Sequence, residues 1–591
     1  MNIEQQLKSD ISIALKTLFD EETEIVLQPT RKDFEGTYTY VFFPLVKRLR
    51  KSPVEIGKNI GEYLKENSAI VSDVNVVQGF LNIILEETVW TNLFNSLLSV
   101  NNQIDFEPKN SSVMVEFSSP NTNKPLHLGH LRNNFLGSSV SSILTANGYD
   151  VSKVCLVNDR GIHICKSMIA YQRFGNNETP ESAGIKGDHL AGRYYVKFDQ
   201  AYKIETAELM AAGQSEDDAK KNAPLMKEAQ AMLIKWEDGD VEVVELWKKM
   251  NTWVYAGFNA TYNKIGVSFD KTYYESDTYV LGKDIVDEGL EKGVFFKKED
   301  NSVWIDLTED GLDEKLVLRG DGTSVYITQD LGTTELKFKD YGSEKAIWVV
   351  GNEQDYHFKV LFAIMKKLGR TYADGCYHLS YGMVDLPSGK MKSREGTVVD
   401  ADDLVAEMIA TAKVSTEEKG KVDTFTEDEK QALFEMLALG ALKYFLLKVE
   451  PKKRMLFNPE ESIDFQGNTG PFIQYTHARI KSILRKAKTE NLEIPVKVDA
   501  VSLAPIETDL IFLLSEYKNS IDKAAQEFAP SVVANYCYDL AKTFNSFYGE
   551  LSVMNEEETA KKDFRLTLIS EVACTLKKGM KLLGIDVPER M

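Results

Sequence analysis

The sequence predicts an α/β protein of several domains, in which a doubly wound parallel sheet follows a small α/β domain and precedes an all-α region. Three observations lead to this prediction. The 591 residues exceed what one hydrophobic core can serve, so we expect about three or four domains. A strand, a polar turn, a helix and a second strand follow one another between 111 and 159. From about 465 to the end the apolar spacing is helical throughout.

Residues 1–110 are the first predicted domain. Apolar residues recur at helical spacing near the N-terminus and predict a helix through Ile3, Leu7, Ile11, Ala14 and Leu18. The stretch 74–85 alternates like a pair of strands broken by Gly79. A basic cluster lies between them, which is either a solvated helix face or a contact surface: Lys47, Arg48, Arg50 and Lys51.

The predicted sheet domain covers 111–400. A strand at 111–117 leads into a helix that starts near Leu128 and stops at Asn147, and 149–159 is the next strand. The charged, largely helical stretch from about 185 to 315 is predicted to be an insertion. The second half resumes at 321–332 and holds a buried strand at 346–354. Two helical regions follow, a connecting one at 401–464 and an all-α domain at 465–591.

The composition restricts the function classes. A net charge of −20 and a pI near 5.1 argue against a nonspecific coat of nucleic acid, but not against a nucleic-acid partner on one local face. Five cysteines without a CxxC pair argue against a disulfide framework or a structural zinc site and fit a reducing compartment. The sequence has no recognisable signal peptide or membrane-spanning run. We therefore expect a cytoplasmic enzyme with no membrane partner.

The first motif with chemical meaning is His127-Leu128-Gly129-His130 at the start of the predicted helix. A helix N-terminus presents unpaired N–H groups and a partial positive charge, which suit phosphate. Histidines at i and i+3 share a face and can both donate to phosphate oxygens. Gly129 leaves room for a flat base near the backbone. The alternative is a helix start with two incidental histidines; the place after a strand and a polar turn favours phosphate.

The second motif is the loop Lys390-Met391-Lys392-Ser393-Arg394, which follows Gly389. Its three cations can neutralise the charge that develops as pyrophosphate leaves a triphosphate. Alone, such a run is also typical of a solvated surface loop. The loop therefore indicates binding of a triphosphate only in combination with the first motif.

An HxGH motif and a KMSKS-like loop, one in each half of a doubly wound sheet, resemble those of class I aminoacyl-tRNA synthetases. The surrounding segments resemble the arginyl-tRNA synthetase family in particular, and they include VEFSSPNTNKPLHLGHLRNN, NDRGIHICKSM, GDHLAGRYYVKF, DGTSVYITQDLGT, GNEQDYHFK, GMVDLPSGKMKSREGTVV, GNTGPFIQYTHARIKSIL and LLGIDVPERM. The resemblance implies a Rossmann-type catalytic domain at 111–400. It also implies ATP-dependent formation of arginyl-adenylate, with Mg²⁺, and transfer of arginine to the 3′-terminal ribose of its tRNA.

Selection of arginine can be argued from its chemistry. A guanidinium is planar, always charged and offers five donors, so a selective pocket needs carboxylates, which also penalise lysine and citrulline. Asp330 and Glu116 are the candidates, because both are expected near the carboxyl ends of adjacent strands. For Glu116 the alternative is a solvent-facing strand residue. The resemblance implies four further contacts to arginine, by Ser119, Asn121, Tyr326 and Gln354.

For ATP, the resemblance implies that His127 and His130 contact the phosphates. It also implies that the backbone near Met383 and Val384 faces adenine, and that Glu353 holds the ribose. Catalysis is then mostly electrostatic, since the carboxylate of arginine is itself the nucleophile.

The loop departs from the family pattern, because Ser393 stands where KMSKS has its second lysine. Lys392 stands one place early and Arg394 one place late. Members of the family with such a loop are thought to compensate with a lysine just before HxGH, which is Lys124 here. The predicted catalytic residues are therefore His127, His130, Lys390 and Lys124. ATP is also expected to contact Gly129, Lys392, Ser393 and Arg394.

The resemblance implies a tRNA partner as well. Residues 465–591 resemble the family's anticodon-binding domain, in which aromatic and cationic side chains suit unstacked bases: Tyr475, His477, Arg479, Arg485, Tyr548 and Met591. For any one of them, packing or a solvated basic face is an equally good interpretation. Residues 1–110 resemble the family's additional tRNA-binding domain, and a monomer is expected.

Three alternatives remain open. Another class I synthetase would activate glutamate, lysine or cysteine, but the zinc ligands of the cysteine enzyme are missing and an acidic pocket is wrong for glutamate. The second alternative is a noncatalytic RNA-binding paralogue. The presence of His127, Lys390, Asp330 and Glu116 argues against it, because a protein without catalytic activity would be free to lose them. A small-molecule nucleotidyltransferase would not explain a long helical C-terminus. Aminoacylation with each amino acid separates these possibilities.

Overall fold

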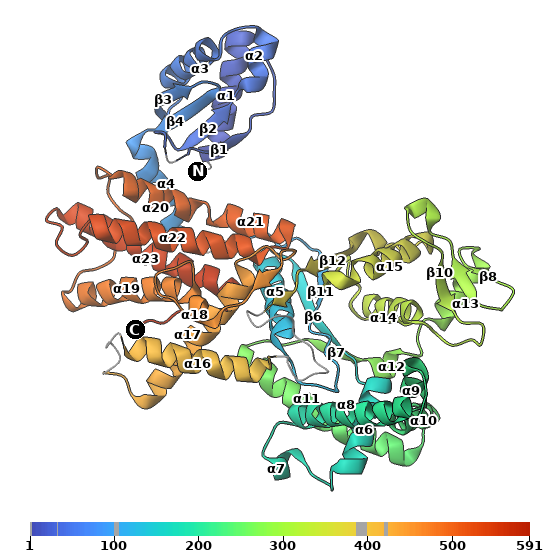
Figure 1. Cartoon of the computed structure of the whole chain (residues 1–591). Helices are drawn as coiled ribbons and strands as arrows, with labels where there is room; N and C mark the ends of the chain where they lie inside the picture. Colours follow the sequence, from blue (N-terminus) through green and yellow to red (C-terminus); the bar gives the residue numbers. More distant parts are fainter. Residues whose placement is uncertain (1–2, 32, 100–105, 386–398, 419–423) are drawn as a thin grey trace. The chain divides into compact units, whose positions relative to one another are not determined.

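The computed structural model describes residues 3–31, 33–99, 106–385, 399–418 and 424–591 (Figure 1). The chain forms two compact units. One consists of 1–104, 480–518 and 539–575, and the other of 105–479, 519–538 and 576–591. The C-terminal helices therefore contribute residues to both units. Among the described helices, none combines the length and the apolar character needed to cross a membrane.

The first unit contains the N-terminal domain, which has a four-stranded antiparallel sheet of order β1-β2-β4-β3. Its elements are α1 Ile3–Phe19, β1 Leu27–Pro29, β2 Tyr38–Val41, α2 Phe43–Leu49, α3 Pro53–Asn67, β3 Val71–Val77, β4 Phe80–Leu85 and α4 Glu87–Ser99. The predicted N-terminal helix is confirmed: α1 buries four of the five apolar positions, whereas Leu18 is exposed. The predicted strand pair at 74–85 is the antiparallel pair of β3 and β4.

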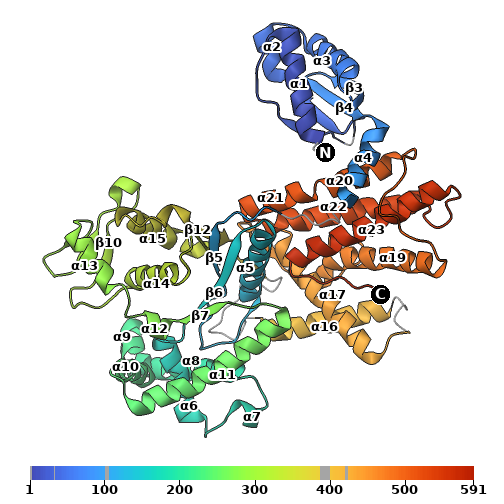
Figure 2. The same ribbon diagram turned by 180° about the vertical axis from the view of Figure 1, so that it is seen from behind.

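The second unit is built on a five-stranded parallel sheet of order β12-β11-β5-β6-β7 (Figures 1 and 2). The strands are β5 Ser112–Glu116, β6 Asp150–Val157, β7 Lys271–Tyr274, β11 Lys345–Gly351 and β12 Cys376–Tyr381. The strand order reverses between β5 and β11, so their carboxyl ends flank the crevice where open α/β sheets bind ligands. The predicted doubly wound sheet is confirmed.

Three helices connect these strands and cover the sheet. They are α5 Leu128–Ala146, α14 Tyr326–Tyr341 and α15 Asp355–Lys367, accompanied by the short turns η2 Asn352–Gln354 and η3 Ala373–Gly375. Helix α5 packs against β5, β6 and β11. An apolar core lies between the sheet, α14 and α15, with buried side chains that include Met114, Val154, Leu331, Ala346, Trp348, Leu361 and Ile364. This core fixes the sheet edge that carries the site.

The predicted insertion at 185–315 is helical at first. Two helices precede it, α6 Ile162–Phe174 and α7 Pro180–Ala183. Its own helices are α8 Gly187–Ala211, α9 Glu216–Asn222, α10 Pro224–Glu237 and α11 Val241–Ile265. As a single interruption of the sheet, however, the prediction was wrong, because the chain returns to the sheet at β7, which pairs with β6. The four residues Lys271–Tyr274 show no strict alternation of apolar and polar side chains, so the sequence pattern did not predict this strand.

After β7 the chain forms α12 Glu275–Thr278, α13 Lys283–Glu291 and a small antiparallel sheet of order β10-β9-β8. The strands are β8 Phe296–Lys297, β9 Val303–Ile305 and β10 Lys315–Leu318, with the turn η1 Thr308–Asp310 between the last two. The predicted strand at 346–354 is β11, which ends at Gly351. The sequence did not predict β12, whose six residues mix polar and aromatic side chains.

In the described part of the remaining chain, the elements are helical except for one two-stranded parallel pair, β13 Val384–Asp385 with β14 Met455–Leu456. The helices are α16 Ala401–Glu417, α17 Glu427–Leu447, α18 Pro459–Ser462, α19 Gly470–Thr489, α20 Pro505–Ser515, α21 Tyr517–Glu527, α22 Pro530–Glu550 and α23 Thr559–Leu582. From 465 to 591 every regular element is a helix, which confirms the predicted all-α region.

Four buried side chains of the second unit donate hydrogen bonds to carbonyl groups of its C-terminal segment, and we call this arrangement the C-terminal clasp. The pairs are Ser139 Oγ with Leu582 (2.9 Å), Lys443 Nζ with Gly584 (2.6 Å), Gln474 Nε2 with Asp586 (2.8 Å) and His477 Nδ1 with Pro588 (2.9 Å). Ser139 belongs to α5, Lys443 to α17, and the other two to α19. Burial lowers the pKa of Lys443 to about 8.

Candidate active site

The HLGH motif forms the N-terminus of α5, as predicted, with His127 as the N-cap residue. The Gly129 N–H donates to His127 Nδ1 over 3.1 Å, and the His127 N–H donates to His130 Nδ1 over the same distance. Each imidazole therefore accepts at Nδ1, and in its neutral form it must carry its proton on Nε2. Two N–H groups of the helix end are thus capped by the histidines themselves.

The two imidazoles are neutral at ordinary pH. Burial, reinforced by Lys124, lowers the pKa of His127 to about 3, and it holds the pKa of His130 well below its usual value. Their ring centroids lie 3.9 Å apart. A β-carbon at Gly129 would lie 3.0 Å from the His127 ring, so the glycine leaves the ring room to fold back onto the helix end. The result is a pair of Nε2–H donors at a helix N-terminus, which suits phosphate oxygens.

The chain pairs with the HLGH turn again just before α16. The Leu128 N–H donates to the Val399 carbonyl (3.2 Å) and the Ala401 N–H to the Leu126 carbonyl (3.0 Å), which makes a short antiparallel bridge between His127 and Asp400. The loop residues Lys390, Lys392, Ser393 and Arg394 lie outside the described residues. The segments before and after that loop are β13 and Val399.

A cavity of about 220 Å³ lies beside the turn and is lined by Lys124, His127, His189, Arg193 and Asp400, among others. Burial lowers the pKa of Lys124. The structure therefore brings Lys124 next to His127, as the sequence predicted.

The residues expected to contact arginine lie along the carboxyl edge of the sheet, but they differ in their surroundings. Glu116 ends β5 as predicted, yet it is 5% exposed and forms an ion pair with the buried Lys337 of α14. A guanidinium would meet an already neutralised carboxylate there, which argues against the predicted role of Glu116. The backbone of Ser119 has a φ of 43°. Asn121 is exposed, and its backbone forms an isolated β-bridge with Asn158, the residue that directly follows β6.

Asp330 lies in the second turn of α14, so a helix and not a strand carries it, and its charge acts on Glu275, which directly follows β7. His357 Nε2 lies 2.6 Å from Asp330 Oδ2. Tyr326, one turn earlier, is 79% exposed, and Gln354 is exposed at the end of η2. Asp330 keeps partial exposure and a second carboxylate oxygen that can meet a substrate.

Glu275 is a site residue that the sequence analysis missed. It follows β7 directly, so it lies at the carboxyl edge of the sheet. Its pKa is raised to about 7, chiefly by burial; the charge of Arg160 opposes this rise, and the charges of Asp159 and Asp330 add to it. A half-buried carboxylate beside a second carboxylate provides the negative charge that a guanidinium needs. The signal could have been an acid directly after a strand, but β7 itself was not recognised.

The residues expected near adenine and ribose lie at the ends of β11 and β12. Met383 and Val384 follow β12, and a β-carbon at Gly351 would be in ordinary contact, 3.8 Å, with Met383 Sδ. Glu353 is exposed in η2, and its charge contributes to raising the pKa of Tyr381, the last residue of β12.

Buried Asn133 of α5 joins the central strands, and the sequence analysis missed it too. The Ser118 N–H donates to its Oδ1 (2.6 Å), and its Nδ2 donates to the Val349 carbonyl (2.7 Å) and to the Tyr381 hydroxyl (3.3 Å). One side chain thus links the ends of β5, β11 and β12 to the helix that carries the histidines.

The residues expected to bind tRNA are placed differently from one another. On α19 the Arg479 guanidinium lies 4.8 Å from the centre of the half-buried Tyr475 ring. His477 is 1% exposed and belongs to the C-terminal clasp, so its predicted contact with RNA is corrected to a packing role. Met591 is half-buried in the second unit, which also contains Tyr475, His477 and Arg479. In the other unit, Arg485 is exposed, and Tyr548 is exposed and stacks on Phe544.

One group of described side chains has the spacing of a metal site: Asp188, His189 and Asp402 have ligand atoms within 4.8 Å of one another. The Lys186 ammonium already binds Asp402 and lies 3.4 Å from Asp188 Oδ2. The positive charge of this cluster therefore comes from lysine, and we assign no metal to it.

The fold and the site are those of a class I aminoacyl-tRNA synthetase, with the histidine motif on the helix after the first strand of a reversed parallel sheet. Three family models match the chain: "tRNA synthetases class I (R), catalytic domain" at 93–458, "DALR anticodon binding domain" at 473–591 and "Arginyl tRNA synthetase N terminal domain" at 3–85. The chain belongs to the arginyl-tRNA synthetase family.

Individual relatives agree over the whole length. The chain is 54% identical to the arginine–tRNA ligase of Amoebophilus asiaticus and 54% identical to that of Bacteroides thetaiotaomicron, with 100% of both chains covered in each comparison. The solved structure of Thermus thermophilus arginyl-tRNA synthetase matches with a TM-score of 0.80 and 26% identity, again over 100% of both chains.

Proposed function

We propose that this chain is an arginine–tRNA ligase that forms arginyl-adenylate from L-arginine and ATP and then esterifies the 3′-terminal ribose of its tRNA. The observation that carries the proposal is the neutral histidine pair at the N-terminus of α5, located at the reversal of strand order. In the first step the carboxylate oxygen of arginine bonds to the α-phosphorus and the bond to pyrophosphate breaks. In the second, a ribose hydroxyl replaces AMP on the arginyl carbonyl.

The residues contribute electrostatics rather than a nucleophile. His127 and His130 donate Nε2–H to phosphate oxygens as charge spreads over the α-phosphate and the leaving pyrophosphate. Lys124 adds a positive charge beside His127, and Lys390 is proposed to add another. The backbone at Met383 and Val384 and the carboxylate of Glu353 are proposed to hold adenine and ribose.

Mg²⁺ is proposed to come with ATP. Lys124, His127 and His130 offer nitrogen atoms at the HLGH turn, whereas Mg²⁺ prefers oxygen ligands, so phosphate oxygens and water would hold the ion. When bound, it would neutralise part of the triphosphate charge.

We propose that Asp330 and Glu275 together receive the guanidinium of arginine. Both are acids at the carboxyl edge of the sheet, and their charges interact with each other. Two carboxylates give a planar cation bidentate partners and leave lysine poorly matched. Ser119, Asn121, Tyr326 and Gln354 remain proposed contacts to the rest of arginine, and Glu116 is proposed to order this edge through Lys337.

The proposed partner of the outer domains is tRNA. Residues 1–110 and 465–591 are proposed to bind tRNA outside the catalytic region 111–400, with 401–464 as the connection. Tyr475, Arg479, Arg485, Tyr548 and Met591 remain candidates for RNA contact. All five cysteines are free thiols, which supports a cytoplasmic location, and a monomer is proposed.

The function is tested by aminoacylation of total tRNA with each amino acid in turn. We expect an alkali-labile product with arginine, and none above background with lysine or citrulline. A product that depends on another amino acid, or no arginine-dependent product, would contradict the proposal.

Replacing Lys124 by alanine should slow arginine-dependent ATP–pyrophosphate exchange, measured with tRNA present, by at least about tenfold, or roughly 1.4 kcal/mol. The reason is the loss of a cation next to His127. Lys197→Ala is the matched control, because this exposed lysine of α8 does not line the cavity. A smaller loss in Lys124→Ala, or an equal loss in the control, would exclude the phosphate role.

A further inference from the structure

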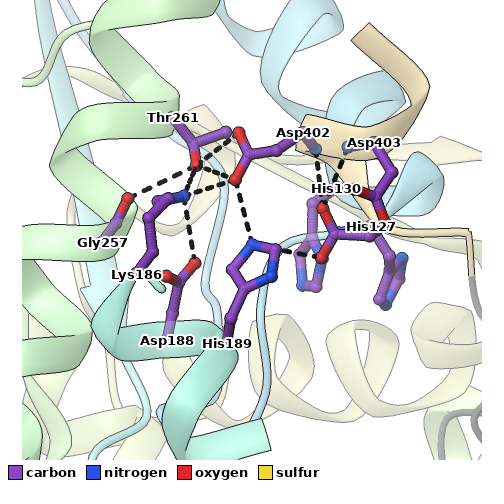
Figure 3. A network of polar contacts seen from close by, with 10 residues as sticks. His127, His130, Lys186, Asp188, His189, Gly257, Thr261, Asp402 and Asp403 are labelled. Carbon is purple, nitrogen blue, oxygen red and sulfur yellow. Dashed lines mark hydrogen bonds and ion pairs between the residues drawn. The ribbon is translucent and has the colours of Figure 1, made fainter. Parts of the chain in front are cut away.

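Helix α8 lies against the HLGH turn and brings a polar cluster with it (Figure 3). A β-carbon at Gly192 would lie 2.7 Å from Pro125 Cδ, so only a bare glycine permits this approach without a shift of the turn. The helix thereby carries His189 to the place where Val399–Ala401 pairs with the turn. The polar side chains of this cluster, Lys186, Asp188, His189, Asp400 and Asp402, have no role in the reaction as described above.

His189 contacts the first turn of α16 at two carboxylates. Its Nε2 atom lies 3.2 Å from Asp402 Oδ2 and 3.5 Å from Asp400 Oδ2. Asp400 is the N-cap of α16: its Oδ1 accepts from the Asp402 N–H (2.8 Å) and the Asp403 N–H (3.3 Å). Its buried Oδ2 accepts no hydrogen bond from the described residues, and the His189 ring lies beside it. Asp400 is also the residue bridged to His127.

A second set of contacts fixes Asp402. Lys186 Nζ binds Asp402 and donates to Thr261 Oγ1 of α11 over 2.6 Å. Thr261 Oγ1 lies 3.1 Å from Asp402 Oδ1. Helices α8 and α11 thus both hold the N-terminus of α16, as Figure 3 shows.

The charges of this cluster balance better when His189 is protonated. Three carboxylates, Asp188, Asp400 and Asp402, face one ammonium, Lys186, so a neutral His189 would leave two excess negative charges in a partly buried place. The hydrogen bond with Asp402 and the charges of Asp400 and Asp188 raise the pKa of His189, against burial and Lys186. From the HLGH turn, Lys124 and His127 line the same cavity, as does Arg193 of α8 itself.

We propose that His189 is a positioning residue for adenylate formation: by bridging Asp400 and Asp402 it holds the N-terminus of α16 against the HLGH turn and so fixes His127. The inference rests on the proposed function, because the position of His127 affects the reaction only if the phosphates of ATP bind at the HLGH turn. A misplacement of about 1 Å in a catalytic group can cost on the order of 10²-fold in rate. Asp330 and Glu275 take part in none of the hydrogen bonds and ion pairs described for this cluster, so binding of arginine should be spared.

The first test measures ATP–pyrophosphate exchange with tRNA present. His189→Ala should lower kcat about tenfold or more and change the KM for arginine less than twofold. Asp402→Asn should also lose activity, whereas Asp403→Asn should stay within twofold of the parent enzyme. Asp403 is the matched control because it is exposed in the same helical turn and its removal changes the helix charge equally. Activity of His189→Ala within twofold of the parent would overturn the proposal, as would equal losses in the two asparagine variants.

The second test uses His189→Gln, which keeps a hydrogen-bond donor but has no proton to lose. It should recover most of the activity lost in His189→Ala. The ratio of parent to His189→Gln activity should fall as pH rises through the pKa of His189. Lys124 titrates in both enzymes, so it cancels in the ratio. A ratio independent of pH would reduce His189 to a packing role and refute the proposal.

The third test does not require activity. Hydrogen–deuterium exchange followed by mass spectrometry should show faster exchange in His189→Ala for peptides that contain the Leu128 and Ala401 amides, which bridge the two segments. Unchanged exchange would refute the positioning role. A parent enzyme without arginine-dependent activity would refute the proposed function alone, so the two failures are distinguishable.

Discussion

Replacing His127 by asparagine should lower the rate of arginyl-adenylate formation about 10²-fold and leave the stability of the protein nearly unchanged. An asparagine side-chain oxygen can take the place of Nδ1 and still cap the Gly129 N–H, but it cannot present the Nε2–H donor. Loss of one donor to a developing oxyanion typically costs about 10²–10³ in kcat. Single-turnover formation of the adenylate and thermal unfolding measure the two effects.

His127→Ala is the informative partner of that variant. It removes both the donor and the cap, so it should lose as much activity as His127→Asn and in addition about 1 kcal/mol of stability. Since the pKa of His127 is lowered to about 3, the imidazole stays neutral from pH 5 to 8 and should add no acidic limb to the rate profile. If His127→Asn kept more than a third of the rate, the phosphate contact would have to come from another group.

Replacing Glu275 by glutamine should reduce kcat/KM for arginine by at least about 30-fold, because loss of one partner of a buried charge pair costs about 2 kcal/mol or more. The discrimination against citrulline should shrink in parallel, since a neutral pocket no longer demands a cation. Arginine-dependent ATP–pyrophosphate exchange, with citrulline as competitor, measures both quantities.

The pH dependence gives Glu275 a second signature. Its pKa is raised to about 7, so in the empty site the carboxylate gains a proton as pH falls through 7, and a protonated acid cannot pair with a guanidinium. The KM for arginine should therefore rise below pH 7 in the parent enzyme and remain flat in Glu275→Gln. Asp277→Asn is the control, because Asp277 is exposed in the same short helix. An acid-side rise of equal size in Glu275→Gln would assign the effect elsewhere.

The HLGH turn could be predicted from the sequence because its chemistry is local. Cap, glycine and second histidine lie within four residues, and Leu128, Leu131 and Phe135 follow at helical spacing. The sheet could be predicted for a similar reason, since β5, β6 and β11 are apolar runs between recognisable turns. The short strand β7 has no such run, and the predicted insertion therefore extended across it.

The arginine pocket could be predicted only in part, because its electrostatics depend on residues far apart in the chain. No pattern around Glu116 indicates that Lys337 will neutralise it, and no pattern around Glu275 indicates that Asp330 will be its neighbour. Burial decides both cases. The same limit applies to His477, which has the spacing of a surface residue on α19 but turns toward the Pro588 carbonyl.

The C-terminal clasp gives the last ten residues an influence on the catalytic helix that their distance along the sequence conceals. Ser139, one of the donors, sits on the same α5 that begins with His127. A chain cut before Leu582 would leave buried hydrogen-bond donors on α5, α17 and α19 without acceptors. Each unpaired donor would lower the free energy of unfolding by about 1–3 kcal/mol. For anyone engineering this enzyme, an affinity tag, a fusion partner or a surface immobilisation site therefore belongs at the other terminus.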